Sequence, residues 1–189
     1  GTGKSLVRMA YERCLGVVPE ENILIITLGK FKGIINEQIP ELPKENLLLE
    51  PYARRTAPCI AYATYTLLKR NPDAVMAATP ADIIVNDEQL FKETMTHALD
   101  YAEKNPVLVT LGVKPDRPDT AYGYIQAVGG KGACNSGDPV KVKTFTEKPD
   151  AEIADVFFRS GEFFWNSGIF VWQASVIKEE MERYIPEIT

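Results

Sequence analysis

The sequence predicts an α/β fold whose mostly parallel sheet is covered by helices on both faces. Two observations lead to this class. Over residues 1–113, short apolar runs rich in β-branched residues alternate with segments of helical periodicity. The length of 189 residues and a hydrophobic content of 45% suit one domain with a substantial core. Because strands that alternate with helices pair in parallel, ligands are expected beyond the carboxyl ends of the strands.

The alternating elements are short and follow one another closely. Strands are expected at 22–27, 46–49, 74–79 and 106–113. Helices are expected at 5–15, 31–38, 57–70 and 88–103. Asp87 is the predicted N-cap of the last helix, and the dipeptide at 71–72, Asn-Pro, is the predicted end of the helix before it.

The pattern changes from residue 114 onward. Further strands are expected at 122–128, 140–145 and 163–172, with a loop rich in Gly, Asn, Ser and Asp at 129–139. No internal repeat or low-complexity tract interrupts the chain. We therefore predict a single domain over residues 1–189, with one half at 1–113 and the other at 114–189.

Charge and composition exclude several classes of protein. The formal net charge is −5, with acidic and basic residues mixed along the chain, which argues against a nucleic-acid binder. Cys14, Cys59 and Cys134 are scattered without CxxC spacing, so we expect neither a disulfide framework nor a zinc site. Such cysteine usage suits a reducing cytoplasm. No apolar run approaches the roughly 20 residues that span a bilayer, and the residues after Gly1 lack a signal-peptide pattern.

The first five residues, GTGKS, share the end of the phosphate-binding pattern G-x-x-x-x-G-K-[ST]. That pattern also needs a preceding strand and an earlier glycine, and neither can be inspected in a chain that starts at Gly1. A glycine turn followed by Ser5 at the start of an amphipathic helix accounts for the same letters. Helix initiation is the favoured interpretation, and an ATPase loop is the alternative.

Two segments place charged side chains at the ends of strands. Asp82 follows the apolar run at 74–79, where a carboxylate enters the ligand crevice and holds Mg²⁺ against phosphates. A cap on the next turn is the alternative. Glu147 and Lys148 follow the strand at 140–145; the carboxylate accepts hydrogen bonds from hydroxyls, and the ammonium suits a phosphate. An ordinary surface tripeptide, Glu-Lys-Pro, is the alternative there.

Two further segments interrupt strand patterns with polar residues or glycine. Asn166 offers two donors and an acceptor within an aromatic run, and Gly168 lets a ligand approach the backbone; a simple turn is the alternative. Gly123 lies between two tyrosines, where glycine indicates a bulge or a close approach to the backbone; a bulge without a ligand is the alternative.

A polar stretch at 50–58 connects a strand to a helix. Glu50 ends the strand, and Arg54 and Arg55 stand near the helix start, where free backbone amides favour an anion or a base edge. An exposed loop with two solvated arginines is the alternative.

Taken together and in this order, these segments resemble the sugar-1-phosphate nucleotidyltransferases, and among them the mannose-1-phosphate guanylyltransferases. The matching segments are GKSL (3–6), EPYARRTAP (50–58), TPAD (79–82), GVKPDRPDTAYGYI (112–125), FTEKPD (145–150) and FFWNSGIFVW (163–172). They cover nearly the whole chain. The combination of EPxxRxTAP with WNSG points to the mannose and guanosine branch.

The resemblance implies a doubly wound, Rossmann-like nucleotidyltransferase fold of the glycosyltransferase-A type. It also implies that GTP reacts with mannose 1-phosphate to give GDP-mannose and pyrophosphate, with Mg²⁺ required and no covalent enzyme intermediate. Residues 1–113 would bind the nucleotide and residues 114–189 the sugar phosphate. Relatives of this kind often dimerise, so a homodimer is expected.

The resemblance further implies a role for each candidate residue. Asp82 would bind the metal and the nucleotide sugar, and Lys148 would hold the sugar phosphate. Glu147 and Asn166 would hold the mannose, with the Gly123 backbone nearby. The residues beside the nucleotide would be Glu50, Arg54 and Arg55.

The chain also departs from the family. The glycine-rich signature of the family would precede Gly1 and its second metal-binding aspartate would follow Thr189, so we expect this stretch to be incomplete at both ends and inactive by itself. Arg55 stands where asparagine is usual, Ile83 where histidine is common, and Ala121 where glycine precedes the tyrosine. These changes bear on the base contact and on the turn before the sugar site.

Two alternatives to this function stay open. One is nucleotidyl transfer to another hexose 1-phosphate, and the other is a non-catalytic module that binds a nucleotide sugar. The single histidine, His97, lies within the expected helix at 88–103 and is expected to be structural or solvated.

Overall fold

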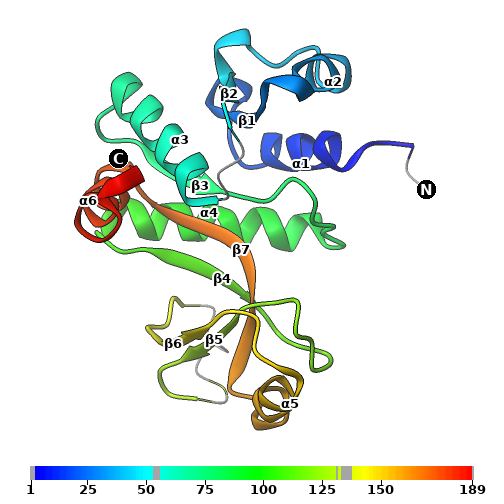
Figure 1. Cartoon of the computed structure of the whole chain (residues 1–189), viewed down its shortest axis with the longest axis vertical. Coiled ribbons are helices and arrows are strands. Elements are labelled where there is room, and N and C mark those ends of the chain that lie inside the picture. The colour runs from blue at the N-terminus through cyan, green and yellow to red at the C-terminus, as the bar shows by residue number, and fades with distance from the viewer. Residues whose placement is uncertain (1–2, 53–55, 131, 133–137, 189) are drawn as a thin grey trace. The chain divides into compact units, whose positions relative to one another are not determined.

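The computed structural model describes residues 3–52, 56–130, 132 and 138–188. Helices and strands alternate from α1 to α4, which confirms the α/β class (Figure 1). The chain divides into two compact units: Gly1–Leu108 with Val171–Thr189 form the first, and Val109–Phe170 form the second. The single domain over 1–189 stays a prediction.

The first unit contains the alternating part of the chain. Its helices are α1 (Leu6–Leu15), α2 (Lys32–Gln38), α3 (Thr56–Arg70), α4 (Glu88–Lys104) and α6 (Ala174–Tyr184). Its strands are β1 (Ile25–Leu28), β2 (Leu47–Glu50) and β3 (Val75–Ala78). Single 3-10 turns are found at Glu20–Asn22, Gly29–Phe31, Lys44–Asn46 and Pro186–Ile188. β1 and β2 pair in parallel, with Ile25 opposite Leu47.

Polar caps fix where two helices of the first unit, α1 and α4, begin. The Ser5 side chain accepts a hydrogen bond from the Arg8 N–H at 3.3 Å, so the helix-initiation interpretation of GTGKS is confirmed. The Asp87 carboxylate accepts from the Leu90 N–H at 2.9 Å, as predicted for the start of α4. His97 is exposed on α4.

The apolar residues of the first unit pack between its helices and strands. Buried side chains from α1, α2 and the segments around them form one cluster, consisting of Tyr11, Ile23, Ile35, Ile39 and Leu42. α3 packs against α6, and α4 against β3. None of the described helices is long and apolar enough to span a bilayer.

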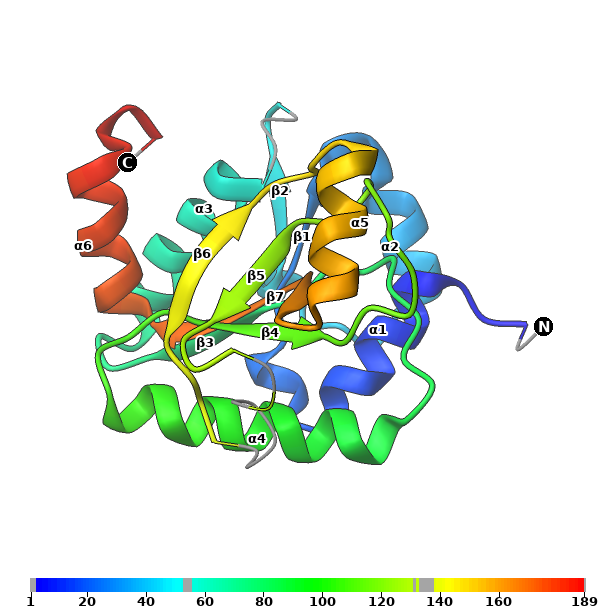
Figure 2. The same cartoon turned by 90° about the horizontal axis from the view of Figure 1, so that it is seen from below.

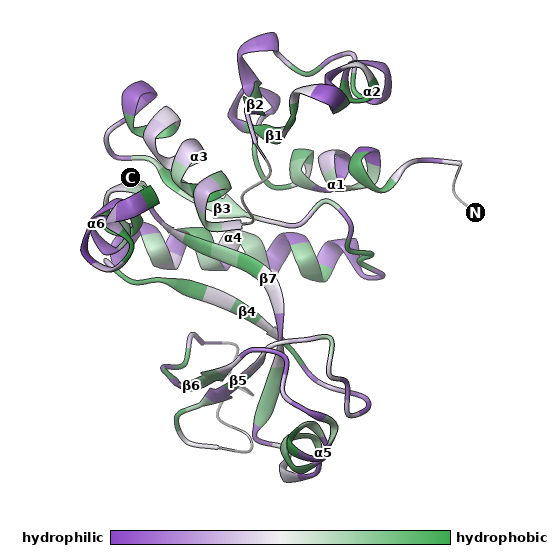
Figure 3. Cartoon of the chain, in the orientation of Figure 1, coloured by the Kyte–Doolittle hydropathy of each residue, from purple (hydrophilic) through white to green (hydrophobic). Residues whose placement is uncertain are grey.

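The second unit is built around antiparallel pairs. It contains β4 (Val109–Val113), β5 (Tyr124–Ala127), β6 (Val142–Thr146), α5 (Ala151–Ser160) and most of β7 (Phe163–Gln173). The strand order is β3-β7-β5-β6, and β4 also pairs with β7. β5 is antiparallel to both β6 and β7, so the sheet is mixed. β4 and much of β7 are coloured hydrophobic in Figure 3.

Helix α5 covers the sheet of the second unit, and Figure 2 shows it beside β5. Its Ala154 and Phe157 pack against Tyr124 and Trp165 from the strands. The sequence analysis did not predict α5 or α6.

Candidate functional site

The candidate residues of the second unit lie on one rung of its sheet. Tyr124 of β5 is opposite both Thr146 of β6 and Trp165 of β7. Because both pairings are antiparallel, the residue before Tyr124 falls beside the residues that follow Thr146 and Trp165. Three segments far apart in the sequence therefore bring Gly123, Glu147 and Asn166 together.

Gly123 is the centre of this rung. Its carbonyl accepts a hydrogen bond from the Asn166 N–H at 2.8 Å. A Cβ at this position would lie 2.7 Å from Oε2 of Glu147 and 3.2 Å from the Phe145 ring. The Glu147 carboxylate and the Phe145 ring therefore occupy the space that a side chain at residue 123 would need.

The side chain of Asn166 is held in place through its amide oxygen, Oδ1. Oδ1 accepts from the Gly168 N–H and from the Thr110 hydroxyl, each at 3.2 Å. Gly168 has a φ of +76°, but residues 165–168 lie within the continuous strand β7, so the simple-turn alternative is wrong and the expected strand is confirmed. The side-chain NH₂ has no acceptor among the described residues, which leaves two donors for a ligand.

Glu147 and Lys148 form an exposed charged turn after β6. Their side chains are 60% and 63% exposed, and the ammonium lies 3.8 Å from the carboxylate. Lys148 has a φ of +46° and is the one non-glycine residue with positive φ in the described part of the chain. Backbone strain of this kind concentrates at functional sites. Pro149, which follows, is buried.

Sequence reasoning missed Thr110, which positions Asn166. Thr110 is a half-buried residue of β4, and its hydroxyl also lies 3.2 Å from the Ile169 carbonyl. The available signal was a hydroxyl inside an apolar strand, because such a group needs a partner when it is buried. Trp165 is buried beneath Tyr122, with ring centroids 4.7 Å apart, so it belongs to the core.

The candidate carboxylate of the first unit is Asp82. It lies in a bend four residues after the end of β3, and its side chain is exposed. No described residue donates a hydrogen bond to it or pairs with it, so the capping alternative finds no support among these residues.

The polar stretch after β2 is only partly described. Glu50 is the half-buried last residue of β2. Burial, and secondarily the Glu50 carboxylate, raises the pKa of the Cys59 thiol to about 11. Arg54 and Arg55 lie outside the described residues.

The described side chains suit one mode of Mg²⁺ binding, in which protein carboxylates supply only part of the ligands. No three His, Cys, Asp or Glu side chains gather as a metal cluster among the residues that the structure describes. Mg²⁺ is often held by one or two carboxylates together with water and substrate phosphates, rather than by a full protein cage. Asp82, exposed and unengaged by described groups, suits that manner of binding.

The fold and these residues define an α/β protein whose mixed sheet brings Gly123, Glu147 and Asn166 together on one rung. The sequence pattern of the nucleotidyl transferase family matches residues 1–189. The chain belongs to this family.

Individual relatives agree with the family match. The mannose-1-phosphate guanylyltransferase of Escherichia coli strain K12 is 38% identical over 176 residues, which are 89% of this chain and 36% of that protein. The xanthan biosynthesis protein XanB of Xanthomonas campestris pv. campestris strain B100 is 41% identical over 167 residues, 87% of this chain and 34% of that protein. The chain thus spans about a third of the length of these curated relatives.

A solved structure shows the same fold. The crystal structure described as mannose-1-phosphate geranyltransferase from Thermus thermophilus matches with a TM-score of 0.86 and 30% identity. The match covers 98% of this chain and 52% of that one. The predicted Rossmann-like nucleotidyltransferase fold is thereby confirmed.

Proposed function

We propose that this chain is part of an enzyme that transfers GMP from GTP to mannose 1-phosphate, giving GDP-mannose and pyrophosphate. The observation that carries the proposal is the rung of Gly123, Glu147 and Asn166, with Lys148 next to it. It combines hydroxyl acceptors, amide donors and a phosphate-binding cation at one place. The guanylyltransferase named above, 38% identical, supports the choice of substrates.

Each sugar-side residue has a role that suits its chemistry. The Glu147 carboxylate accepts hydrogen bonds from mannose hydroxyls, and the Asn166 NH₂ donates to hydroxyl oxygens. The Lys148 ammonium binds the sugar phosphate as a point charge. Gly123 has no side chain, so its backbone lies close to the sugar. A side chain there would also displace Glu147.

The nucleotide side is proposed from the first unit. Asp82 would hold Mg²⁺, which when bound neutralises phosphate charge. Glu50, Arg54 and Arg55 would lie beside the nucleotide. A cytoplasmic location and a homodimer belong to the same proposal.

The reaction needs no covalent enzyme intermediate. An oxygen of mannose 1-phosphate attacks the α-phosphorus of GTP and forms a new P–O bond. The bond from the α-phosphorus to the bridging oxygen breaks, and its electron pair leaves with pyrophosphate. The protein contributes positioning of both phosphates and neutralisation of their charge.

The test is a calorimetric titration of this chain with GDP-mannose and Mg²⁺. Asp82→Ala and Asn166→Ala are each expected to weaken binding about tenfold or more, because hydrogen bonds and contacts to charged groups contribute about 1.5–3 kcal/mol. Asp100→Ala, an exposed carboxylate of α4, is the matched control and is expected to change nothing. Equal affinities for all four proteins would contradict the proposed site.

A further inference from the structure

The segment that carries Asp82 has few polar links to the rest of its unit. Residues 80–86 connect β3 to α4 without regular structure, and their backbone makes no hydrogen bond to the backbone of another described residue. Among the described residues, one hydrogen bond to this segment is local, from the Thr79 hydroxyl to the Pro80 carbonyl at 3.3 Å. The other comes from Arg13 of α1, whose Nη1 donates to the Ile83 carbonyl at 3.5 Å.

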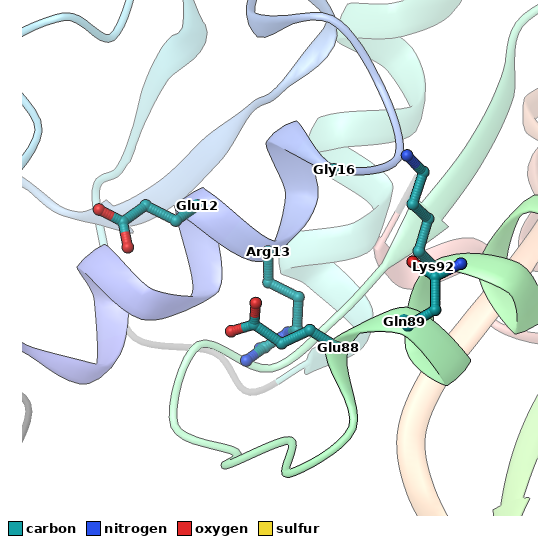
Figure 4. Close-up of a pocket in the computed structure, with 6 residues that line it drawn as sticks. All are labelled: Glu12, Arg13, Gly16, Glu88, Gln89 and Lys92. Atoms are coloured by element: carbon teal, nitrogen blue, oxygen red, sulfur yellow. The ribbon is translucent and has the colours of Figure 1, made fainter.

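Arg13 is an unusual residue to find at this place. Its side chain is 6% exposed, and the guanidinium lies 5.2 Å from the centre of the Phe91 ring of α4. It lines a cavity of about 170 Å³ together with residues of α1 and α4 (Figure 4). In that view the side chain extends from α1 toward the segment that precedes α4, beside Glu88.

The guanidinium is only partly satisfied by described groups. Nε and Nη2 are buried and have no hydrogen-bond partner among the described residues. Burying a charged group without partners is costly, so Arg13 opposes folding at a position where an apolar side chain of similar size would serve packing better. Its one polar partner in the described part of the chain is the carbonyl of the residue after Asp82.

We propose that Arg13 is a positioning residue that holds the 80–86 segment and thereby sets the place of the Asp82 carboxylate. A tether at residue 83 limits the motion of a carboxylate one residue away, on a segment with no backbone ladder of its own. Groups that orient a metal-binding carboxylate typically change metal affinity about 10- to 100-fold when they are removed. This inference rests on the proposed function, because it gives Asp82 the role described there.

The experiment replaces Arg13 and measures stability and binding separately. Arg13→Met keeps the bulk and removes the buried charge, so the melting temperature is expected to stay equal or to rise. The affinity for GDP-mannose in Mg²⁺ is expected to fall about tenfold or more, while the affinity in EDTA stays unchanged. Arg8→Met makes the same change at a half-buried arginine of α1 that pairs with Glu12 and Glu41 instead of the 80–86 segment; this control is expected to leave both affinities as they are.

A double-mutant cycle with Asp82→Asn shows whether Arg13 acts through Asp82. If it does, Arg13→Met adds no further loss once Asp82 is neutralised. The proposal would be overturned if the losses of affinity from Arg13→Met and Asp82→Asn added up in the double variant. It would also be overturned if Arg13→Met left the affinity for GDP-mannose in Mg²⁺ unchanged. If Arg13→Met does not fold, Arg13→Lys carries the same cycle, and with its charge but fewer donors it is expected to give a smaller loss.

The two proposals fail in different ways. Absence of GDP-mannose binding by the unaltered chain would contradict the proposed binding site in this chain and, with it, the role of Arg13. Binding that depends on Asp82 but not on Arg13 would refute the role of Arg13 alone.

Discussion

Position 123 shows how a single residue type controls the site. Gly123→Ala would place a Cβ 2.7 Å from Oε2 of Glu147, whose exposed side chain is free to move away. We expect the free energy of unfolding to change by less than about 1 kcal/mol, because an exposed side chain yields easily. Displacement of Glu147 is expected to weaken GDP-mannose binding about tenfold in a calorimetric titration.

Gly33→Ala is the control for this substitution. Gly33 lies in α2, and no atom lies within 4 Å of a Cβ built there. Gly33 is the second residue of α2, where alanine is favoured over glycine by less than the roughly 1 kcal/mol of a helix interior, so this variant is expected to keep or slightly gain stability and to keep its affinity. A Gly123→Ala protein that binds as well as Gly33→Ala would contradict a close sugar site at residue 123.

Lys148 combines a strained backbone with a charge that binds phosphate. A left-handed conformation costs a non-glycine residue about 1–2 kcal/mol, and Lys148 has a φ of +46°. Lys148→Gly and Lys148→Ala both remove the ammonium, but only glycine relieves the strain. We expect the glycine variant to be more stable than the alanine variant by about 1 kcal/mol in denaturant titrations. Equal stabilities of the two variants would show that the turn is unstrained. Both variants are expected to lose affinity for the sugar phosphate to the same extent, because both lack the ammonium.

At the scale of elements, α5 depends on an N-cap for its stability. The Asp150 carboxylate accepts a hydrogen bond from the Ile153 N–H at 2.9 Å. Asp150→Ala is expected to lower the free energy of unfolding by about 1 kcal/mol, measured by urea titration. Asp155→Ala on the same helix removes only an exposed ion pair with Arg159 and is expected to cost less than about 0.5 kcal/mol. A cost for Asp150→Ala no larger than that of this control would rule out the cap.

The elements that the sequence predicted are those with a strong period or a clear cap. Strands β1 to β3 were visible as apolar runs, and Asp87 marked the start of α4. Helix α5 was not predicted, although the sequence contains both its N-cap, Asp150, and Gly161, the glycine at which it ends. Gly161 is left-handed in the structure. The motif at 145–150 serves two purposes, because its last residue, Asp150, is also the N-cap of α5.

At the scale of the whole molecule, the sequence predicted candidate residues but not the contacts that hold them. The rung of Gly123, Glu147 and Asn166 depends on the registers of two antiparallel pairs, and register is not visible in a single sequence. Thr110 and Arg13 act through partners far along the chain, at Asn166 and Ile83. Neither stands in a recognisable motif, so only the three-dimensional arrangement gives them a role.

The division into units leads to a prediction about the order of ligand contacts. Every proposed sugar-side residue belongs to the second unit, where strand pairing and the hydrogen bond from Asn166 to Gly123 hold the site together. Asp82 belongs to the first unit. We therefore expect mannose 1-phosphate to bind without nucleotide or metal, and the affinity to be unchanged by Asp82→Ala.

Titration of the chain with mannose 1-phosphate in EDTA measures this directly. Lys148→Met is expected to weaken binding about tenfold or more, because it removes a charge-assisted contact to the phosphate. Lys143→Met, an exposed lysine of β6 in the same unit, is the control and is expected to change little. Loss of binding in Asp82→Ala would contradict the prediction, because the sugar phosphate would then depend on a residue of the first unit even when neither nucleotide nor metal is present.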